Sequence, residues 1–155
     1  DADFCLQYGI DPTAVRAAGA GGARRGGSTI SQQTAKNVFL WQARSWTRKG
    51  LEAGFTLVIE GLWGKRRILE VYLNVAEFDE GVFGVGAAAP HYFGVAADRV
   101  SPTQAARLMA VLPNPKRRSA SRPTDGLKRR AAQIASGAKL IRTDGRTRCI
   151  QPLAR

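Results

Sequence analysis

Polar side chains with helical spacing follow a glycine pair in the segment 26–37, GGSTISQQTAKN. In a helix, Gln32 shares a face with Lys36, four residues later, and Gln33 has the same relation to Asn37. The Ser and Thr hydroxyls ahead of them suit an N-cap, and the N–H groups and dipole of a helix N-terminus favour an anion. Two amides, a hydroxyl and a cation at such a place indicate a site for a sugar that carries a phosphate.

Three helices must position these side chains. The sequence predicts helices over 29–42, 47–63 and 65–74, with a break at 41–46. The middle helix has apolar residues at the i, i+4, i+7 spacing, and Gly64 ends it. These residues are Leu51, Phe55, Val58, Ile59 and Leu62.

The remaining elements are also predicted to be helical, because no convincing period-2 pattern of a strand occurs. We expect a short helix near 12–18, a loop over 19–27, a loop over 77–86 and a helix over 87–93. Ser101 and Pro102 favour the start of a helix that ends near Leu112. A last helix is predicted over 126–141, with a frayed tail from Arg142. The fold class is therefore mainly α.

The chain has 155 residues, which is the size of one domain, and we expect a single domain over 1–155. Lys and Arg number 24 against 12 acidic residues, for a net charge of +12. This excess favours a polyanionic partner, such as nucleic acid, an acidic membrane surface or a phosphorylated substrate, although a solvated surface would explain it equally well. No run of ~18 apolar residues predicts a membrane span.

Cysteine and histidine are scarce. Cys5 and Cys149 give no metal pattern; a bridge between them is conceivable, and the sequence does not decide it. His91 is the only histidine, which makes a Ser/His triad or a His-based zinc site a poor explanation, and we expect it to be partly buried.

Four blocks of sequence, in order, resemble the glycosyltransferase domain that polymerises bacterial peptidoglycan, especially the monofunctional biosynthetic transglycosylases. They are GGSTISQQTAKN (26–37), RKGLE (48–52), KRRILEVYLN (65–74) and GVGAAAPHYFG (84–94), and the weaker LMAVLPNP (108–115) also fits. The resemblance implies a lysozyme-like, mainly helical fold on the outer face of the cytoplasmic membrane, with an N-terminal membrane anchor.

The resemblance also implies a reaction. The 4-hydroxyl of an acceptor sugar attacks the anomeric carbon of lipid II, and undecaprenyl pyrophosphate departs with inversion. This chemistry needs a carboxylate to take the proton and cations to stabilise the diphosphate. The implied partners are lipid II, the growing glycan chain, the membrane surface and proteins of cell-wall synthesis or division, with no nucleic acid. Mg²⁺ is a candidate bridge to the diphosphate, without a protein metal site.

Residue by residue, the resemblance makes Lys36 and Arg44 contacts of the pyrophosphate and Glu52 a catalytic residue that positions cations or assists departure of the leaving group. The predicted substrate-binding set is Ser28, Gln32, Gln33, Lys36, Asn37, Arg44, Arg48 and Lys49.

Alternatives exist for several of these residues. Glu52 follows Arg48 by four positions and Lys49 by three, so an ordinary ion pair on a helix surface would give the same pattern. Gln32 and Gln33 could simply cap backbone groups. Trp41 and Trp46 are expected to pack, with a place at a membrane interface as the alternative.

The family's first motif is incomplete here. Asp1 aligns with the motif's Asp, so the general-base Glu belongs one residue upstream, and Gln7 stands where the motif has His. We therefore expect a domain truncated at its N-terminus, without the anchor and the first catalytic Glu, that polymerises poorly as written. Two other functions compete: a basic nucleic-acid-binding module, and a lysozyme-like hydrolase that cleaves glycan with carboxylates.

Overall fold

The computed structural model describes residues 3–10, 28–41 and 45–151. The chain divides into two compact units, one formed within Asp1–Tyr72 and Arg146–Arg155 and the other by Leu73–Gly145. The prediction of one domain over 1–155 stays a prediction. The helix predicted near 12–18 and the loop over 19–27 lie outside the described residues.

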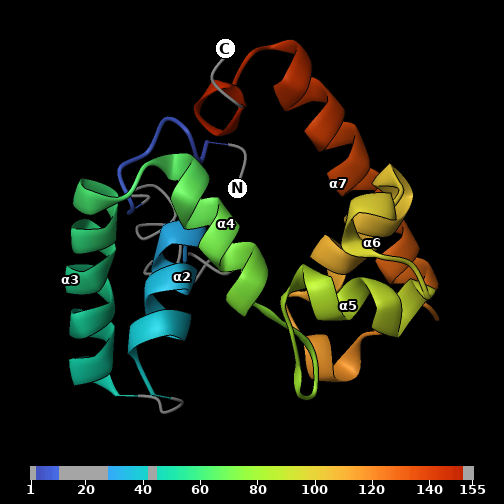
Figure 1. Ribbon diagram of the computed structural model, residues 1–155, viewed down its shortest axis with the longest axis horizontal. Coiled ribbons are helices and arrows are strands. Elements are labelled where there is room, and N and C mark those ends of the chain that lie inside the picture. Colours follow the sequence, from blue (N-terminus) through green and yellow to red (C-terminus); the bar gives the residue numbers. More distant parts are fainter. Residues whose placement is uncertain (1–2, 11–27, 42–44, 152–155) are drawn as a thin grey trace. The chain divides into compact units, whose positions relative to one another are not determined.

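Two helices of the first unit, α2 (Ile30–Phe39) and α3 (Trp46–Leu62), pack side by side (Figure 1). The third, α4 (Lys65–Val75), begins in this unit, and its last residues are assigned to the second. These bounds confirm the predicted helices over 29–42, 47–63 and 65–74. The helix α2 is shorter than predicted because Leu40 has extended backbone angles.

The core of the first unit brings together residues from both ends of the sequence. Phe4 is buried with Ala35 of α2, Ile59 of α3 and Ile68 of α4, and Ile150 packs against them. Burying such apolar surface is the main driving force for holding the segment 3–10 on the helices. Gly9 makes close packing there feasible: its φ is +70°, and a Cβ would lie 2.7 Å from Thr56 Cγ2.

A disulfide joins Cys5 to Cys149 across a sequence separation of 144 residues. The sequence left this bridge open. The same C-terminal segment forms the short 3₁₀ helix η3 (Arg148–Ile150), and Thr147 is buried. The prediction of a frayed tail from Arg142 is therefore wrong, because a covalent bond and burial, neither of them local in sequence, hold residues 146–150.

The second unit contains a small sheet that the sequence did not predict. Strands β1 (Glu77–Asp79) and β2 (Val82–Phe83) pair antiparallel within the segment predicted to be a loop. They are too short to show an alternating pattern. The helix α5 (Gly84–Phe93) starts directly after β2, three residues earlier than predicted.

His91 of α5 is exposed rather than partly buried. Its Nε2 lies 3.0 Å from Asp79 Oδ2 of β1. The backbone N–H of Glu80 is the largest influence lowering the pKa of Asp79, and the hydrogen bond with His91 lowers it further. His91 thus links α5 to the hairpin.

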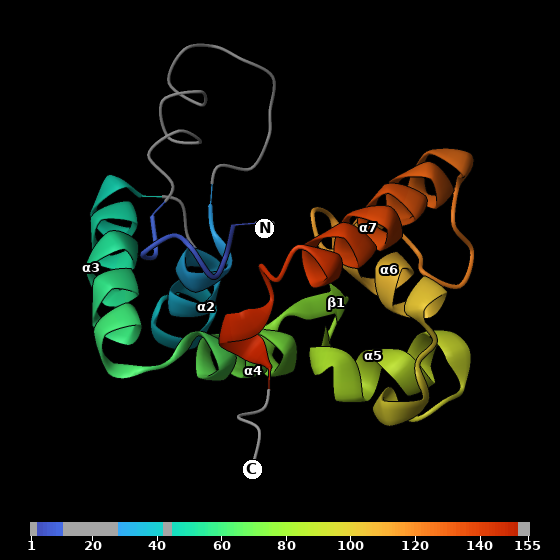
Figure 2. The same ribbon diagram turned by 90° about the horizontal axis from the view of Figure 1, so that it is seen from above.

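The helices α6 (Pro102–Val111) and α7 (Asp125–Thr143) lie side by side in both views (Figures 1 and 2). Ser101 and Gln104 form a reciprocal capping box, as expected of a Ser–Pro start. Two 3₁₀ turns, η1 (Ala97–Arg99) and η2 (Pro115–Arg117), precede and follow α6.

The mainly α fold class is confirmed. Within residues 3–10, 28–41 and 45–151, no helix is both long and apolar enough to cross a membrane. Trp41 and Trp46, which we expected to pack, are instead 54% and 92% exposed.

Candidate anion-binding site

The start of α2 is organised by its own side chains. Thr29 is the N-cap: its hydroxyl accepts a hydrogen bond from the N–H of Gln32, and the amide oxygen of Gln32 accepts one from the N–H of Thr29, at 3.0 Å. This reciprocal capping box satisfies two N–H groups that a helix start otherwise leaves without partners. Gln32 is buried, so the structure gives it the capping role that the sequence left as an alternative.

The other two polar residues of this helix differ in their surroundings. The amide of Gln33 donates to the carbonyl oxygen of Ser28 at 3.3 Å, which is again a bond to the local backbone. Asn37 is exposed and projects about 100° around the helix from Lys36. Substrate contacts by Gln32, Gln33 and Asn37 stay predictions.

The first turns of α3 bring a second set of predicted residues together. Glu52 is 3% exposed, and its carboxylate accepts a hydrogen bond from the ammonium of Lys49 and lies 3.9 Å from an Arg48 guanidinium nitrogen. These are the i, i+3 and i, i+4 pairs expected from spacing. The carboxylate is buried, however, which an ion pair on a helix surface would not require.

The ammonium of Lys49 also connects the two helices. It lies 3.4 Å from the Oγ of Ser28, the residue before the N-cap of α2. The predicted residues Ser28, Lys49 and Glu52 therefore form one connected group at the N-terminal ends of α2 and α3.

Lys36 belongs to the same electrostatic environment. Burial lowers the pKa of its ammonium, the carboxylate of Glu52 opposes that shift, and the cations Arg48 and Lys49 lower the pKa further. Arg48 and Lys49 pair with the carboxylate of Glu52, and Lys36 lies within electrostatic range of it, so positive charge is in excess. Lys36 and Arg48 are partly shielded from water, so this excess of charge attracts an anion more strongly than a set of fully exposed lysines would.

Arg48 has unused hydrogen-bonding capacity. Its Nε is buried and has no hydrogen-bond partner in the part of the chain that the structure describes. A buried N–H without a partner costs free energy, and an anion placed beside the guanidinium would remove that cost. The cation group (Lys36, Arg48 and Lys49, with Glu52) is therefore suited to bind an anion with several oxygens.

Arg44, the other predicted pyrophosphate contact, lies outside the described residues. The sequence did not reveal the partners of Glu60. Its carboxylate accepts hydrogen bonds from Ser31 at 2.5 Å and from Lys65 at 2.6 Å. The spacing of Glu60 and Lys65 is not helical, and Ser31 is distant in sequence, so no local pattern signals this contact.

The residues offer little to a metal ion. Across the residues described, no group of three or more His, Cys, Asp or Glu side chains could hold one. The carboxylate of the cation group is already engaged by Lys49 and Arg48. A metal held by protein ligands does not fit here.

The comparisons with known proteins agree with the mainly helical fold. The family model described as Transglycosylase matches residues 1–139, and the chain belongs to this family. Its fold is the mainly helical, lysozyme-like kind that the resemblance implied.

Curated relatives named biosynthetic peptidoglycan transglycosylase are similar over most of this sequence. That of Jannaschia sp. (strain CCS1) is 62% identical over 149 residues, covering 96% of this chain and 62% of the relative. That of Rhodospirillum centenum is 54% identical, and the match covers 97% of this chain and 67% of the relative. That of Pseudomonas aeruginosa is 57% identical, and the match covers 86% of this chain and 60% of the relative. The chain thus spans about three fifths to two thirds of their length. These matches support neither a nucleic-acid-binding module nor a hydrolase.

Proposed function

We propose that this protein is a peptidoglycan glycosyltransferase that polymerises lipid II into glycan strands and releases undecaprenyl pyrophosphate. The observation that carries the proposal is the pairing of Arg48 and Lys49 with the buried Glu52, within electrostatic range of Lys36. The names of the relatives supply the substrate class: a biosynthetic peptidoglycan transglycosylase extends a glycan.

The cation group acts on the leaving group. The bond from the anomeric carbon to the diphosphate oxygen breaks, both bonding electrons go to the diphosphate, and negative charge grows where Lys36, Arg48 and Lys49 lie. Cations fixed in place before the reaction stabilise this charge without reorganising. Glu52 holds Arg48 and Lys49 in place and does not take the proton.

The attacking hydroxyl needs a separate base. The acceptor's 4-hydroxyl oxygen forms the new bond to the anomeric carbon, and its proton passes to a carboxylate. The resemblance places that carboxylate one residue before Asp1. Mg²⁺ could bridge diphosphate oxygens without protein ligands, so the proposal requires no metal site.

The proposed location is the extracytoplasmic face of the cytoplasmic membrane. The Cys5–Cys149 disulfide fits an oxidising compartment, since such bonds are rare in the cytosol. The exposed Trp41 and Trp46 are amphipathic aromatics of the kind enriched at membrane interfaces. The membrane surface is thus a proposed partner, as are proteins of cell-wall synthesis or division.

The test supplies the full-length protein with lipid II and analyses the products. Glycan strands together with undecaprenyl pyrophosphate would support the proposal. Release of muropeptides from finished peptidoglycan, without strands from lipid II, would favour the hydrolase. Tighter, salt-sensitive binding to DNA than to lipid II would favour the nucleic-acid-binding module.

A further inference from the structure

We infer that Glu60 and Lys65 are a positioning pair, which sets the N-terminal segment 3–10 and the start of α2 against α3 without touching the substrate. The inference rests on the proposed function, because the reaction concerned is glycosyl transfer. It goes further by giving a role to two residues outside the cation group.

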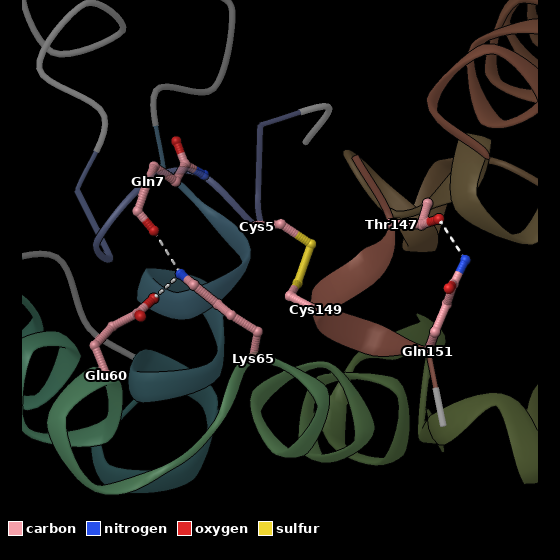
Figure 3. Close-up of a disulfide and its surroundings, with 7 residues drawn as sticks. All are labelled: Cys5, Gln7, Glu60, Lys65, Thr147, Cys149 and Gln151. Carbon is pink, nitrogen blue, oxygen red and sulfur yellow. Dashed lines mark hydrogen bonds and ion pairs between the residues drawn. A yellow bond between two sulfur atoms is a disulfide. The ribbon is translucent and has the colours of Figure 1, made fainter. Parts of the chain in front are cut away.

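Glu60 is buried, Lys65 is partly buried, and each has more than one polar contact. The side chain of Glu60 is 2% exposed and that of Lys65 is 14% exposed. The ammonium of Lys65 donates to Glu60 Oε1 and to the carbonyl oxygen of Gln7, both at 2.6 Å (Figure 3). It also lies 4.8 Å from the centre of the Phe4 ring, within the range of a cation–π interaction.

The pair and the residues that it contacts belong to four segments. Glu60 lies near the end of α3, Lys65 begins α4, and Ser31, which donates to Glu60, lies in the first turn of α2. Gln7 and Phe4 belong to the segment 3–10. One ammonium and one carboxylate therefore connect four segments, and removing the charges would loosen all four connections.

A second contact joins the segment 3–10 to the start of α2. The hydroxyl of Thr29 donates to the carbonyl oxygen of Gly9 at 2.5 Å while it accepts from the N–H of Gln32. Gly9 itself packs against the pair, since a Cβ there would lie 3.0 Å from Glu60 Cγ. The pair thus supports the backbone that Thr29 holds.

The path from the pair to the cation group is short. Ser28 adjoins Thr29, and the hydroxyl of Ser28 accepts a hydrogen bond from the ammonium of Lys49. Lys49 in turn pairs with Glu52. A shift at the start of α2 would therefore move Ser28 relative to Lys49. Small errors in the placement of reacting groups are costly, on the order of a hundredfold in rate for 1 Å. The affinity of the cation group for the diphosphate depends less on such a shift than the rate does, because attraction between charges falls off slowly with distance.

The experiment replaces the pair in the full-length protein by neutral residues of similar size, as the double variant Glu60→Gln/Lys65→Met. We expect kcat for polymerisation of lipid II to fall at least about tenfold while KM changes less than about threefold. Hydrogen exchange at the amides of residues 3–10 and 28–31 should also become faster, whereas that of α7 should not.

The matched control is Asp125→Asn/Lys128→Met. This pair has a similar length, 3.0 Å, but is exposed on α7. The kcat of this control variant should stay within twofold of the kcat of the unchanged protein. Thermal unfolding and circular dichroism establish that each variant is folded at the assay temperature.

Unchanged kcat and unchanged exchange in a folded double variant would overturn the inference, as would a loss carried by KM alone. If the double variant does not fold, Ser31→Ala takes its place, because it removes one donor to Glu60 and no charge. A fall in kcat of threefold or more at constant KM supports the inference, and an unchanged kcat overturns it. Failure of the unchanged full-length protein to polymerise lipid II would instead refute the proposed function, and the exchange data would still decide the positioning.

Discussion

The ammonium of Lys49 lies 3.4 Å from the hydroxyl of Ser28, so the first turn of α3 contacts the residue just before the cap of α2. Because Lys49 also pairs with the buried Glu52, one side chain links the start of α2 to the carboxylate around which the cations gather.

Replacing Lys36 by Ala should lower kcat for lipid II polymerisation by about a hundredfold or more, because the departing diphosphate loses a preorganised cation. The fold should stay intact, since a partly buried charge is removed rather than left alone. Steady-state kinetics and circular dichroism measure the two effects. The control is Lys139→Ala, which removes an exposed lysine of α7 and should keep full activity. Unchanged turnover in the Lys36 variant would mean that the site is misplaced.

Glu52→Gln should reduce both activity and stability. The buried carboxylate compensates Arg48 and Lys49, and the amide would leave these cations without a counter-charge. We expect a loss of about 1–3 kcal/mol in the free energy of unfolding, measured with urea, because hydrogen bonds to charged groups are of that size. The control is Glu80→Gln, an exposed carboxylate that should change stability very little. Equal effects of the two substitutions would contradict a special role for Glu52.

Stability should depend on pH through Lys36, whose pKa burial lowers from the usual 10.5. As pH rises towards 10.5, the folded protein loses this proton before the unfolded chain does, so the unfolded chain binds more protons and the contribution of Lys36 to the free energy of unfolding becomes more favourable. Lys36→Met should therefore be more stable than the unchanged protein near neutral pH, by a margin that narrows as the pH rises. Urea unfolding across this range measures the margin. A margin that is constant or grows with pH would contradict the burial of this charge.

Replacing both cysteines, as Cys5→Ser/Cys149→Ser, should lower the free energy of unfolding by about 2–4 kcal/mol. The bond closes a loop across a sequence separation of 144 residues, and without it the unfolded chain gains conformational freedom. Urea unfolding with and without a reductant measures the loss. The double variant should not respond to the reductant, which serves as the control. A stability unaffected by reduction would show that this cross-link contributes nothing.

Trp46→Ser combined with Trp41→Ser should weaken binding to phospholipid vesicles roughly tenfold, since two amphipathic rings no longer enter the interface. Both rings are exposed, so stability should change little. Co-sedimentation with vesicles that contain anionic lipid gives the affinity. Leu140→Ser removes an exposed apolar side chain from α7 instead and should leave it unchanged. Equal binding by the unchanged protein, the double Trp variant and the Leu140 variant would argue against Trp41 and Trp46 as membrane contacts.

Local signals predicted much of the fold. Ser101 with Pro102 marked the start of α6, and Gly64 marked the end of α3, because caps and helix breakers act within a few residues. The hairpin of β1 and β2 was missed because strands this short show no alternation. The ordered segment 146–150 was missed because its partner, Cys5, lies at the other end of the sequence.

The site was predictable to a similar extent. Helical spacing indicated the pairing of Glu52 with Arg48 and Lys49, and the capping alternative for Gln32 was visible in the sequence. The burial of Glu52 and the contact between Lys49 and Ser28 arise from the packing of α2 on α3. No pattern within a single helix encodes such contacts.

The bridge between Cys5 and Cys149 has a practical consequence for handling the protein. A protease that cuts the chain once at any point between these residues would yield two fragments that remain one molecule. On a denaturing gel without thiol they would migrate as a single band, and adding thiol would separate them. Purity judged without thiol would therefore hide a nicked preparation.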